Sequence, residues 1–220
     1  MRRKRLRAVF FGPQGAGKSV QASLLAERFN VPLVSSGEAF RAEIGENTAI
    51  GDLVSEYVTA GMFAPDELAN AILTKRLKAS DPDDGFVLDG YPRNVEQAET
   101  LDRFARMTLA TQLKISDTCA VKRLTGRLVC ASCHATLHRD GMTIATGLRP
   151  CPVCGGKLSA RSKDEEDAVC RRLAAYHFMT EPLAAYYRQR GVLLAVNGEQ
   201  TISDLFEELT RKLAKLGFVA

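Results

Sequence analysis

The sequence predicts an α/β fold in which a parallel five-stranded sheet is flanked by helices. Five short apolar runs, each bounded by turn or charged residues, are typical of strands buried on both faces. Apolar residues at helical spacing occupy the stretches between these runs. With 220 residues, 45% of them hydrophobic, the chain is long enough to bury such a core. The predicted strands are residues 6–11, 31–35, 86–89, 112–115 and 192–196.

The helices are predicted from apolar stripes that recur every three or four residues. A further helical pattern covers residues 166–188, and Pro182 is expected to break or kink it because proline cannot donate a helical hydrogen bond. The stripes expected to face the core are Val20, Leu24, Leu25 and Phe29; Leu68, Ile72, Leu73 and Leu77; and Ile202, Leu205, Phe206, Leu209, Leu213 and Leu216.

Two stretches do not fit the alternation of strands and helices and are predicted to be insertions. Residues 36–65 indicate short helices, whereas residues 128–162 are rich in Cys, Gly, Thr and Pro. The core domain is therefore predicted over residues 1–35, 66–127 and 163–220.

Charge and hydropathy favour a cytoplasmic protein. The net charge is only +4, and the basic cluster at residues 2–7 is interpreted as a solvated tail. The apolar stretch after it ends at Gly12 and Pro13, too early for a signal peptide, and no window approaches the roughly 20 apolar residues of a membrane span. We expect neither a membrane nor a nucleic acid as partner.

The sequence GPQGAGKS, which begins at Gly12, matches the G-x-x-x-x-G-K-S/T pattern of a phosphate-binding loop. It lies between a predicted strand and a predicted helix, so main-chain N–H groups and the helix dipole would converge on one anion. Gly12, Gly15 and Gly17 permit tight turns and close approach to phosphate oxygens. Lys18 is expected to reach the β- and γ-phosphates of a nucleotide, and the Ser19 hydroxyl to face Mg²⁺.

A carboxylate at the end of a second strand supports this interpretation. In the sequence FVLDG, Asp89 ends an apolar run beside the first strand, where it can hold Mg²⁺ through water. An aspartate before glycine is, taken alone, more often a turn residue. Next to a phosphate loop, the magnesium role is the stronger hypothesis.

Four cysteines in the second insertion predict a structural zinc site. Cys130, Cys133, Cys151 and Cys154 have the spacing C-x2-C-x17-C-x2-C, in which each pair offers two thiolates on one side of a knuckle. Four protein ligands would close the coordination sphere and stabilise a segment with little core of its own. Two disulfides are the alternative, and the expected cytosolic setting disfavours them.

The sequences GPQGAGKS, SSGEAFR, LDGYPRNVEQA and RLAAYH occur in this order, and together they resemble the adenylate kinase family of nucleoside-monophosphate kinases. The match covers essentially the whole chain after the basic N-terminus. The resemblance implies a sheet core, an AMP-binding insertion over residues 36–65 and a zinc-ribbon-like lid over residues 128–162 that closes over ATP. It also implies reversible phosphoryl transfer from Mg-ATP to AMP by a monomer that needs Mg²⁺ and a structural Zn²⁺.

The resemblance also assigns individual residues. Arginine suits phosphate because its planar fork binds two oxygens and stays charged. Residues implied at ATP are Gly12, Gly15, Ala16, Gly17, Lys18, Ser19, Val20, Arg123 and Arg127. Residues implied at AMP are Ser36, Arg41, Ala64, Arg93, Gln97, Arg161 and Arg172, with Ser36 and Gln97 at the adenine. The implied catalytic cations are Lys18, Arg93, Arg123, Arg161 and Arg172.

The chain departs from the family pattern at four positions. Ser19 stands where the family often has glycine, so the hydroxyl that faces Mg²⁺ is shifted relative to the family pattern. Val20 and Pro65 stand where the family commonly has threonine, and Lys163 replaces one acid of the usual acidic pair after Arg161. These departures concern substrate preference and the latching of the lid, and they leave the set of cations intact.

Two other functions are weighed against adenylate kinase. A kinase for CMP, UMP or GMP would share Lys18, Asp89 and the arginines but differ at the base. A nucleotide-gated nucleic-acid-binding switch would need a basic, aromatic ribbon surface. Residues 130–154 have only Arg139 and Arg149 as strong positive charges and contain no Phe, Tyr or Trp, so this second alternative is disfavoured.

Overall fold

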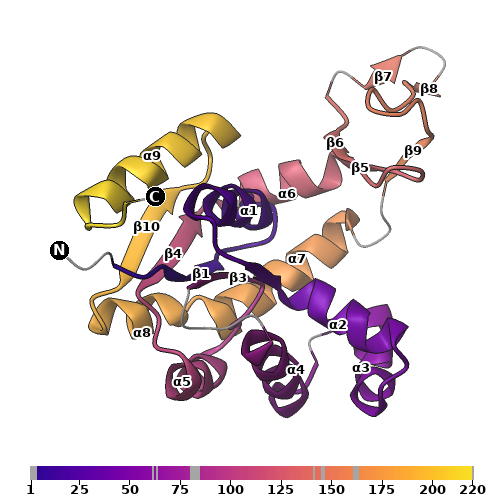
Figure 1. Cartoon of the computed structure of the whole chain (residues 1–220). Helices are drawn as coiled ribbons and strands as arrows, with labels where there is room; N and C mark the ends of the chain where they lie inside the picture. Colours follow the sequence, from indigo (N-terminus) through magenta and orange to yellow (C-terminus); the bar gives the residue numbers. More distant parts are fainter. Residues whose placement is uncertain are drawn as a thin grey trace.

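The structure is a computed structural model that describes residues 4–60, 62, 64–79, 85–140, 142–144, 147–160 and 164–219. Its centre is a five-stranded parallel sheet with the strand order β10-β4-β1-β3-β2 (Figure 1). The strands are β1 Arg7–Phe11, β2 Leu33–Ser35, β3 Phe86–Asp89, β4 Leu109–Lys114 and β10 Leu193–Asn197. The predicted α/β fold class is therefore confirmed.

All five predicted strands are present; β3 has the predicted bounds, and the bounds of the other four are shifted. The largest shift is in β4, which begins at Leu109, three residues before the predicted start at Gln112. Ala110 and Thr111 give this part of the sequence little β-branched apolar character, yet both are fully buried because β4 lies between β1 and β10. Burial between two neighbouring strands therefore overrides the weak local preference.

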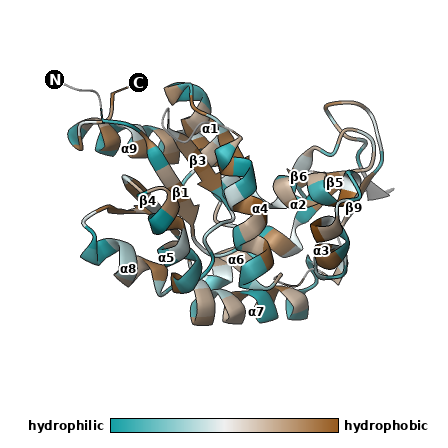
Figure 2. Ribbon diagram, turned by 60° about the horizontal axis from the view of Figure 1, so that its bottom comes forward, coloured by the Kyte–Doolittle hydropathy of each residue, from teal (hydrophilic) through white to brown (hydrophobic). Residues whose placement is uncertain are grey.

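Helices cover both faces of the sheet. Figure 1 shows α1 and α9 on one face and α4, α5 and α8 on the other. Side chains of β1 alternate between these layers: Ala8 and Phe10 pack in the cluster of α1 and α9, and Val9 and Phe11 pack in the opposite cluster. In Figure 2 the sheet strands are largely brown, as expected for strands buried on both faces. The helices are α1 Lys18–Phe29, α2 Ser36–Gly45, α3 Ala49–Ala60, α4 Asp66–Lys78, α5 Val95–Phe104, α6 Asp117–Thr125, α7 Glu166–Ala175, α8 Leu183–Gln189 and α9 Ile202–Lys215.

The stripe predicted for α1 is wrong at its first position. Val20 is 42% exposed, and the buried face of the helix is instead Gln21, Ala22, Leu25 and Ala26. The first turn of α1 borders a cavity beside the loop that precedes it, so its apolar side chain faces that cavity instead of the core.

The stripe predicted for α9 is wrong at its two ends. Ile202 and Leu216 are exposed, whereas Leu205, Leu209 and Leu213 in the middle of the helix are buried. The end residues therefore reach past the part of the sheet that α9 covers.

The break predicted at Pro182 is confirmed. Helix α7 continues into a π-helical turn, η2 (Tyr176–Thr180), and α8 begins after the proline. The Thr180 hydroxyl at the end of this turn donates to the carbonyl of Arg93 at 2.7 Å, so the irregular turn lies beside the end of β3 and the loop that follows it.

The cysteine segment, residues 128–162, contributes to a small sheet of its own. Strands β5 (Arg127–Cys130), β6 (Thr136–His138) and β9 (Leu158–Ala160) pair antiparallel in the order β6-β5-β9. Strands β7 (Thr143–Ile144) and β8 (Gly147–Leu148) pair antiparallel in a separate two-stranded sheet. Figure 1 shows the three-stranded sheet beyond the end of α6, away from the main sheet. Among the helices that the structure describes, none combines the length and the apolar character that a membrane crossing requires.

Candidate active site

The loop between β1 and α1 has a main chain that depends on glycine. Gly12, Gly15 and Gly17 have φ values of 147°, 84° and 85°, which side chains other than glycine rarely adopt. Gly12 also lies so close to β4 that a Cβ there would collide with the carbonyl oxygen of Leu113. Gly17 is the N-cap of α1 and makes no side-chain cap bond, so the first N–H groups of the helix remain available to a ligand.

Lys18 is folded back over the loop. Its Nζ donates to the carbonyl oxygens of Gly12 at 2.9 Å and Pro13 at 2.8 Å. Burial lowers the pKa of Lys18 to about 8; the positive charge of Arg93 adds to this effect, and Asp89 opposes it. The ammonium group is therefore held close to the loop in an environment where an anion would stabilise its charge.

Ser19 and Asp89 come together as the sequence predicts. The Ser19 hydroxyl in the first turn of α1 donates to Oδ2 of Asp89, at the end of β3, at 2.5 Å. The parallel pairing of β1 with β3 brings the two residues to the same edge of the sheet. A hydroxyl and a carboxylate are oxygen ligands that suit Mg²⁺ and its water shell, so the residues present fit this ion.

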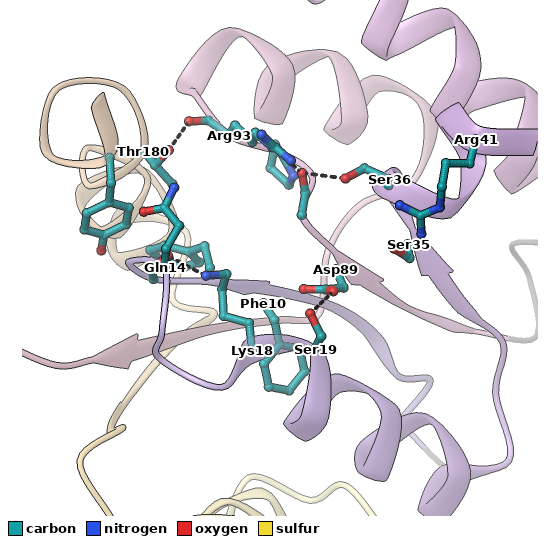
Figure 3. A pocket seen from close by; sticks show the side chains of 16 residues that line it. Phe10, Gln14, Lys18, Ser19, Ser35, Ser36, Arg41, Asp89, Arg93 and Thr180 are labelled. Atoms are coloured by element: carbon teal, nitrogen blue, oxygen red, sulfur yellow. Dashed lines mark hydrogen bonds between the residues drawn. The ribbon is translucent and has the colours of Figure 1, made fainter. Parts of the chain in front are cut away.

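Three cavities follow one another across this edge. A loop cavity of about 700 Å³ lies over the phosphate loop, a middle cavity has about 370 Å³, and a helical cavity of about 200 Å³ lies among α2, α4 and α5. Lys18 and Ser19 line both the loop cavity and the middle cavity, while Arg41 and Arg93 line both the middle cavity and the helical cavity. In Figure 3 the lysine and the two arginines face the middle cavity from different sides.

The loop cavity contains the residues that the sequence assigned to ATP, from Gly15 to Val20 together with Arg123 and Arg127. Gly12 lies instead in the lining of the middle cavity. Arg123 donates from one guanidinium nitrogen to the carbonyl oxygens of Gly15 at 3.2 Å and Gly198 at 2.8 Å. It thereby connects α6 to the loop and to the residues after β10.

Arg127 and Arg172 share a buried carboxylate. Arg127 binds Asp164 through two hydrogen bonds, of 2.7 and 2.6 Å, and Arg172 donates to the same side chain at 3.2 Å. The Asp164 side chain is 2% exposed, which makes this a partly desolvated cluster of two positive charges and one negative charge. The sequence interpretation missed Asp164 as a site residue, although the acidic pair after Arg161 was the available signal. Arg161 and Lys163 lie outside the described residues.

The helical cavity brings together the residues assigned to AMP, namely Ser36, Arg41, Ala64, Arg93 and Gln97. The exceptions are Arg172, which lines the loop cavity, and Arg161.

Several of these side chains are held by local hydrogen bonds. The Ser36 hydroxyl and Nε of Arg93 both donate to the carbonyl oxygen of Gly90, at 3.0 and 2.8 Å. Burial lowers the pKa of Arg93, and the nearby Asp89 opposes this effect. Gln97 is bonded through its side-chain amide to Asp66, a residue of this cavity that the sequence interpretation missed.

The four cysteines form one cluster. Their sulfur atoms all lie within 4.8 Å of one another, with Cys130 to Cys154 at 3.5 Å and Cys133 to Cys151 at 3.7 Å, and all four thiols are free. Four sulfurs at about 2.3 Å from a tetrahedral zinc are about 3.8 Å apart, so the donor set fits Zn²⁺. A main-chain hydrogen bond at Cys133 lowers the pKa of Cys130, whereas the pKa of Cys133 is raised by its hydrogen bond with Cys154, so the close thiols share their protons unequally.

Fold and site together define a class of protein. A glycine loop and lysine at the head of the first helix, with a cavity that leads on to further arginines, are typical of P-loop proteins that hold phosphate groups at the edge of a parallel sheet.

The comparisons with known proteins narrow this class. The family model described as adenylate kinase matches residues 10–192. The chain is 37% identical over 217 residues to the adenylate kinase of Thermoanaerobacter sp. (strain X514), covering 96% of this chain and all of the relative. It is 38% identical to adenylate kinases of Caldanaerobacter subterraneus subsp. tengcongensis and Clostridium botulinum (strain Langeland), covering 94% and 96% of this chain and 96% and 99% of the relatives. The chain belongs to the adenylate kinase family, and the resemblance seen in its sequence motifs is confirmed.

Proposed function

We propose that this protein transfers the terminal phosphoryl group of Mg-ATP reversibly to AMP and forms two ADP. The observation that carries the proposal is the row of three cavities with cations at both of its junctions. ATP would lie in the loop cavity and AMP in the helical cavity, with the reacting phosphates in the middle cavity. Family membership supports phosphoryl transfer to a nucleoside monophosphate, and the AMP assignment rests on the base-side residues Ser36, Ala64 and Gln97.

The reaction needs no nucleophile from the protein. A phosphate oxygen of AMP forms a bond to the γ-phosphorus of ATP, while the bond from that phosphorus to the β,γ-bridging oxygen breaks and leaves its electron pair on ADP. The enzyme must therefore hold two polyanions in line and neutralise the charge on the equatorial oxygens. Lys18 serves this purpose from the loop side, and Arg41 and Arg93 serve it from the opposite side.

Lys18 moves its hydrogen bonds when the substrate binds. In the present structure its Nζ bonds to the carbonyls of Gly12 and Pro13, so an arriving phosphate competes with neutral acceptors for a charged donor. A hydrogen bond from an ammonium to a charged phosphate oxygen is stronger than one from the same ammonium to a neutral carbonyl, so the exchange favours the phosphate.

Ser19 and Asp89 would hold Mg²⁺ through its water shell. The ion, when bound, neutralises part of the charge on the β- and γ-phosphates. The hydrogen bond between the two side chains keeps both oxygens at the cavity beside Lys18 before the nucleotide arrives.

The remaining arginines would act from the lid side. Arg123 and Arg127 are proposed at ATP, and Arg172 and Arg161 at the transferred group. Because Asp164 holds both Arg127 and Arg172, one carboxylate orients two cations next to the loop cavity. Because both arginines are already ordered, less conformational entropy is lost when the substrate binds.

We propose the division of labour that the sequence suggested: a core over residues 1–35, 66–127 and 163–220, an AMP-binding insertion over 36–65 and a lid over 128–162. Water is the competing phosphoryl acceptor, so a lid that closes over both nucleotides would suppress hydrolysis. The thiolates of the cysteine cluster would hold a structural Zn²⁺, which stabilises a lid whose own core is small.

The experiment that tests the proposal is a panel of phosphate acceptors. ADP formation from Mg-ATP is measured with AMP, CMP, UMP and GMP in turn. We expect AMP to have the highest kcat/KM. If another monophosphate equals or exceeds AMP, the AMP assignment is wrong; if ATP is only hydrolysed and no acceptor is phosphorylated, the whole proposal fails.

A further inference from the structure

The side-chain amide of Gln97, at the base end of the helical cavity, is held from two sides. Its Oε1 accepts a hydrogen bond from the main-chain N–H of Arg93 at 2.8 Å, and its Nε2 donates to Oδ1 of Asp66 at 2.7 Å. A main-chain N–H can only donate and a carboxylate can only accept, so the hydrogen-bond partners themselves determine which end of the amide is oxygen. Gln97 is 4% exposed, so a reversed amide would leave buried groups unpaired.

Asp66 is itself held by a second amide of known orientation. The Oδ1 of Asn94 accepts from the main-chain N–H of Gln97 at 2.8 Å and caps α5, which turns the Nδ2 of Asn94 toward Asp66. This Nδ2 donates to Oδ2 of Asp66 at 2.7 Å. Asp66 is thus an acceptor between two amide donors, and each oxygen of its carboxylate accepts one of the two hydrogen bonds.

These contacts leave Gln97 with a defined pattern for a ligand. One lone pair on Oε1 and one hydrogen on Nε2 remain after the bonds to Arg93 and Asp66 are counted. Adenine offers an amino donor beside a ring-nitrogen acceptor, which matches this pattern, and cytosine offers the same pair. Guanine and uracil offer a carbonyl acceptor beside an N–H donor, and they would match only a reversed amide.

We propose that Asp66 is a specificity-determining positioning residue, which fixes the orientation of the Gln97 amide so that the base site accepts the edge of adenine and rejects that of guanine or uracil. The inference rests on the proposed function, because it requires that the base of the acceptor nucleotide occupies the helical cavity. Asp66 acts through Gln97 and is not itself assigned a contact with the nucleotide.

The test is the variant Asp66→Asn. Its amide can present an oxygen to only one of Gln97 and Asn94, so the Gln97 amide loses one of its two constraints and reversal becomes less costly. We expect the ratio of kcat/KM for GMP to that for AMP to rise about tenfold. The ratio of CMP to AMP should stay unchanged because both bases offer the same edge, and the KM for ATP should stay unchanged as well.

Two further variants separate positioning from general effects. Glu67→Gln removes a charge of the same sign from the same helix turn at an exposed position, and it should leave all ratios unchanged. The double variant combines Asp66→Asn with Asn94→Asp. The carboxylate introduced at position 94 can still cap α5, and it accepts a hydrogen bond from the amide nitrogen introduced at position 66. The oxygen of that amide then faces Gln97. We expect this swap to restore the discrimination against GMP.

The outcomes are distinct. If Asp66→Asn lowers the melting temperature but leaves the GMP-to-AMP ratio unchanged, or if GMP and CMP gain equally, Asp66 is only structural and the inference is overturned. If Asp66→Asn does not fold, Asp66→Ser takes its place: the GMP-to-AMP ratio should rise in Asp66→Ser and stay at the wild-type value in the double variant, and an unchanged ratio in Asp66→Ser overturns the inference. A wild-type enzyme that does not prefer AMP contradicts the proposed function itself, which the wild-type panel reveals before any variant is made.

Discussion

The phosphate loop and the base end of the helical cavity are built in different ways. The loop binds through its main chain, whose course depends on glycines within six residues of one another and on one lysine. The base end depends on side chains: Gln97 and Asp66 are 31 positions apart in the sequence but hydrogen-bonded in space. A site made of main chain leaves a local sequence pattern, whereas a site made of paired side chains becomes visible only when the chain is folded.

The difference also separates affinity from specificity. In the proposed function, main-chain N–H groups and Lys18 recognise phosphate, which every nucleotide carries, so they cannot tell one base from another. The amide of Gln97 offers a directional pattern and can discriminate. Variants in the loop should therefore change the rate for all acceptors together, while variants around Gln97 change the ratios among acceptors.

The largest expected effect is the loss of catalysis in Lys18→Met. Removing the ammonium group that bonds the loop should lower kcat about 10³-fold or more, because the charge that develops on the transferred phosphoryl group loses a fixed cation. Steady-state kinetics with AMP and GMP and a thermal melt check the prediction. A folded variant with near-normal turnover would contradict it, and so would a variant in which the ratio between the two acceptors changes with the rate.

A large effect on stability is expected for Gly12→Ala, with Gly17→Ala as its matched control. Both positions have positive φ, but only at Gly12 would a Cβ meet the main chain of β4, whereas at Gly17 no atom of the described residues lies within 4 Å of it. We expect Gly12→Ala to cost about 2–4 kcal/mol and Gly17→Ala about 1 kcal/mol, measured by urea unfolding. Equal costs would mean that the loss of stability in Gly12→Ala comes from the backbone conformation at Gly12 and not from its close approach to β4.

The cysteine cluster combines features of the phosphate loop and the base end of the helical cavity. Its expected metal ligands are side chains, as at the base end, but they form two local C-x2-C pairs that are visible in the sequence, as the loop is. Cys151→Ser, or removal of metal by a chelator, should lower the melting temperature by several degrees. At low temperature it should change ADP formation much less, since in the proposed function the cluster stabilises the lid and does not contact the reacting groups. Metal analysis accompanies the melt, and a melting curve that is unchanged after complete metal loss would exclude a structural role.

A smaller expected effect is the uptake of a proton by Lys18 when ATP binds. The pKa of Lys18 is lowered to about 8 in the free protein, so the ammonium is mostly charged at pH 7 and mostly neutral at pH 9. Bound phosphates raise this pKa again, so ATP binding should take up close to one proton at pH 9 and little at pH 7, and affinity should fall as the pH rises above 8. Calorimetry in two buffers of different ionisation enthalpy measures the uptake, and Lys18→Met should remove it. Equal uptake by the wild type and the variant would assign the proton to another group.

Much of the fold was predictable because buried parallel strands are short apolar runs, and the phosphate loop was predictable because its glycines and lysine are adjacent. The contact of Ser19 with Asp89 followed from strand ends that share one edge of the sheet. The pairing of Arg127 and Arg172 through Asp164 did not follow. Asp164 lies eight positions before Arg172 but 37 positions after Arg127, across an insertion without a regular hydrophobic period. Val20 was assigned to the core because periodicity does not show where a helix stops facing the sheet and starts facing a cavity.

The central claim is that the loop cavity and the helical cavity hold two nucleotides with their phosphates meeting in the middle cavity. The most direct measurement is a calorimetric titration with a bisubstrate compound in which two adenosines are joined through a polyphosphate chain. One molecule should bind per protein, and saturating amounts of it should abolish the binding of both ATP and AMP. Two molecules per protein, or competition with ATP alone, would contradict the account.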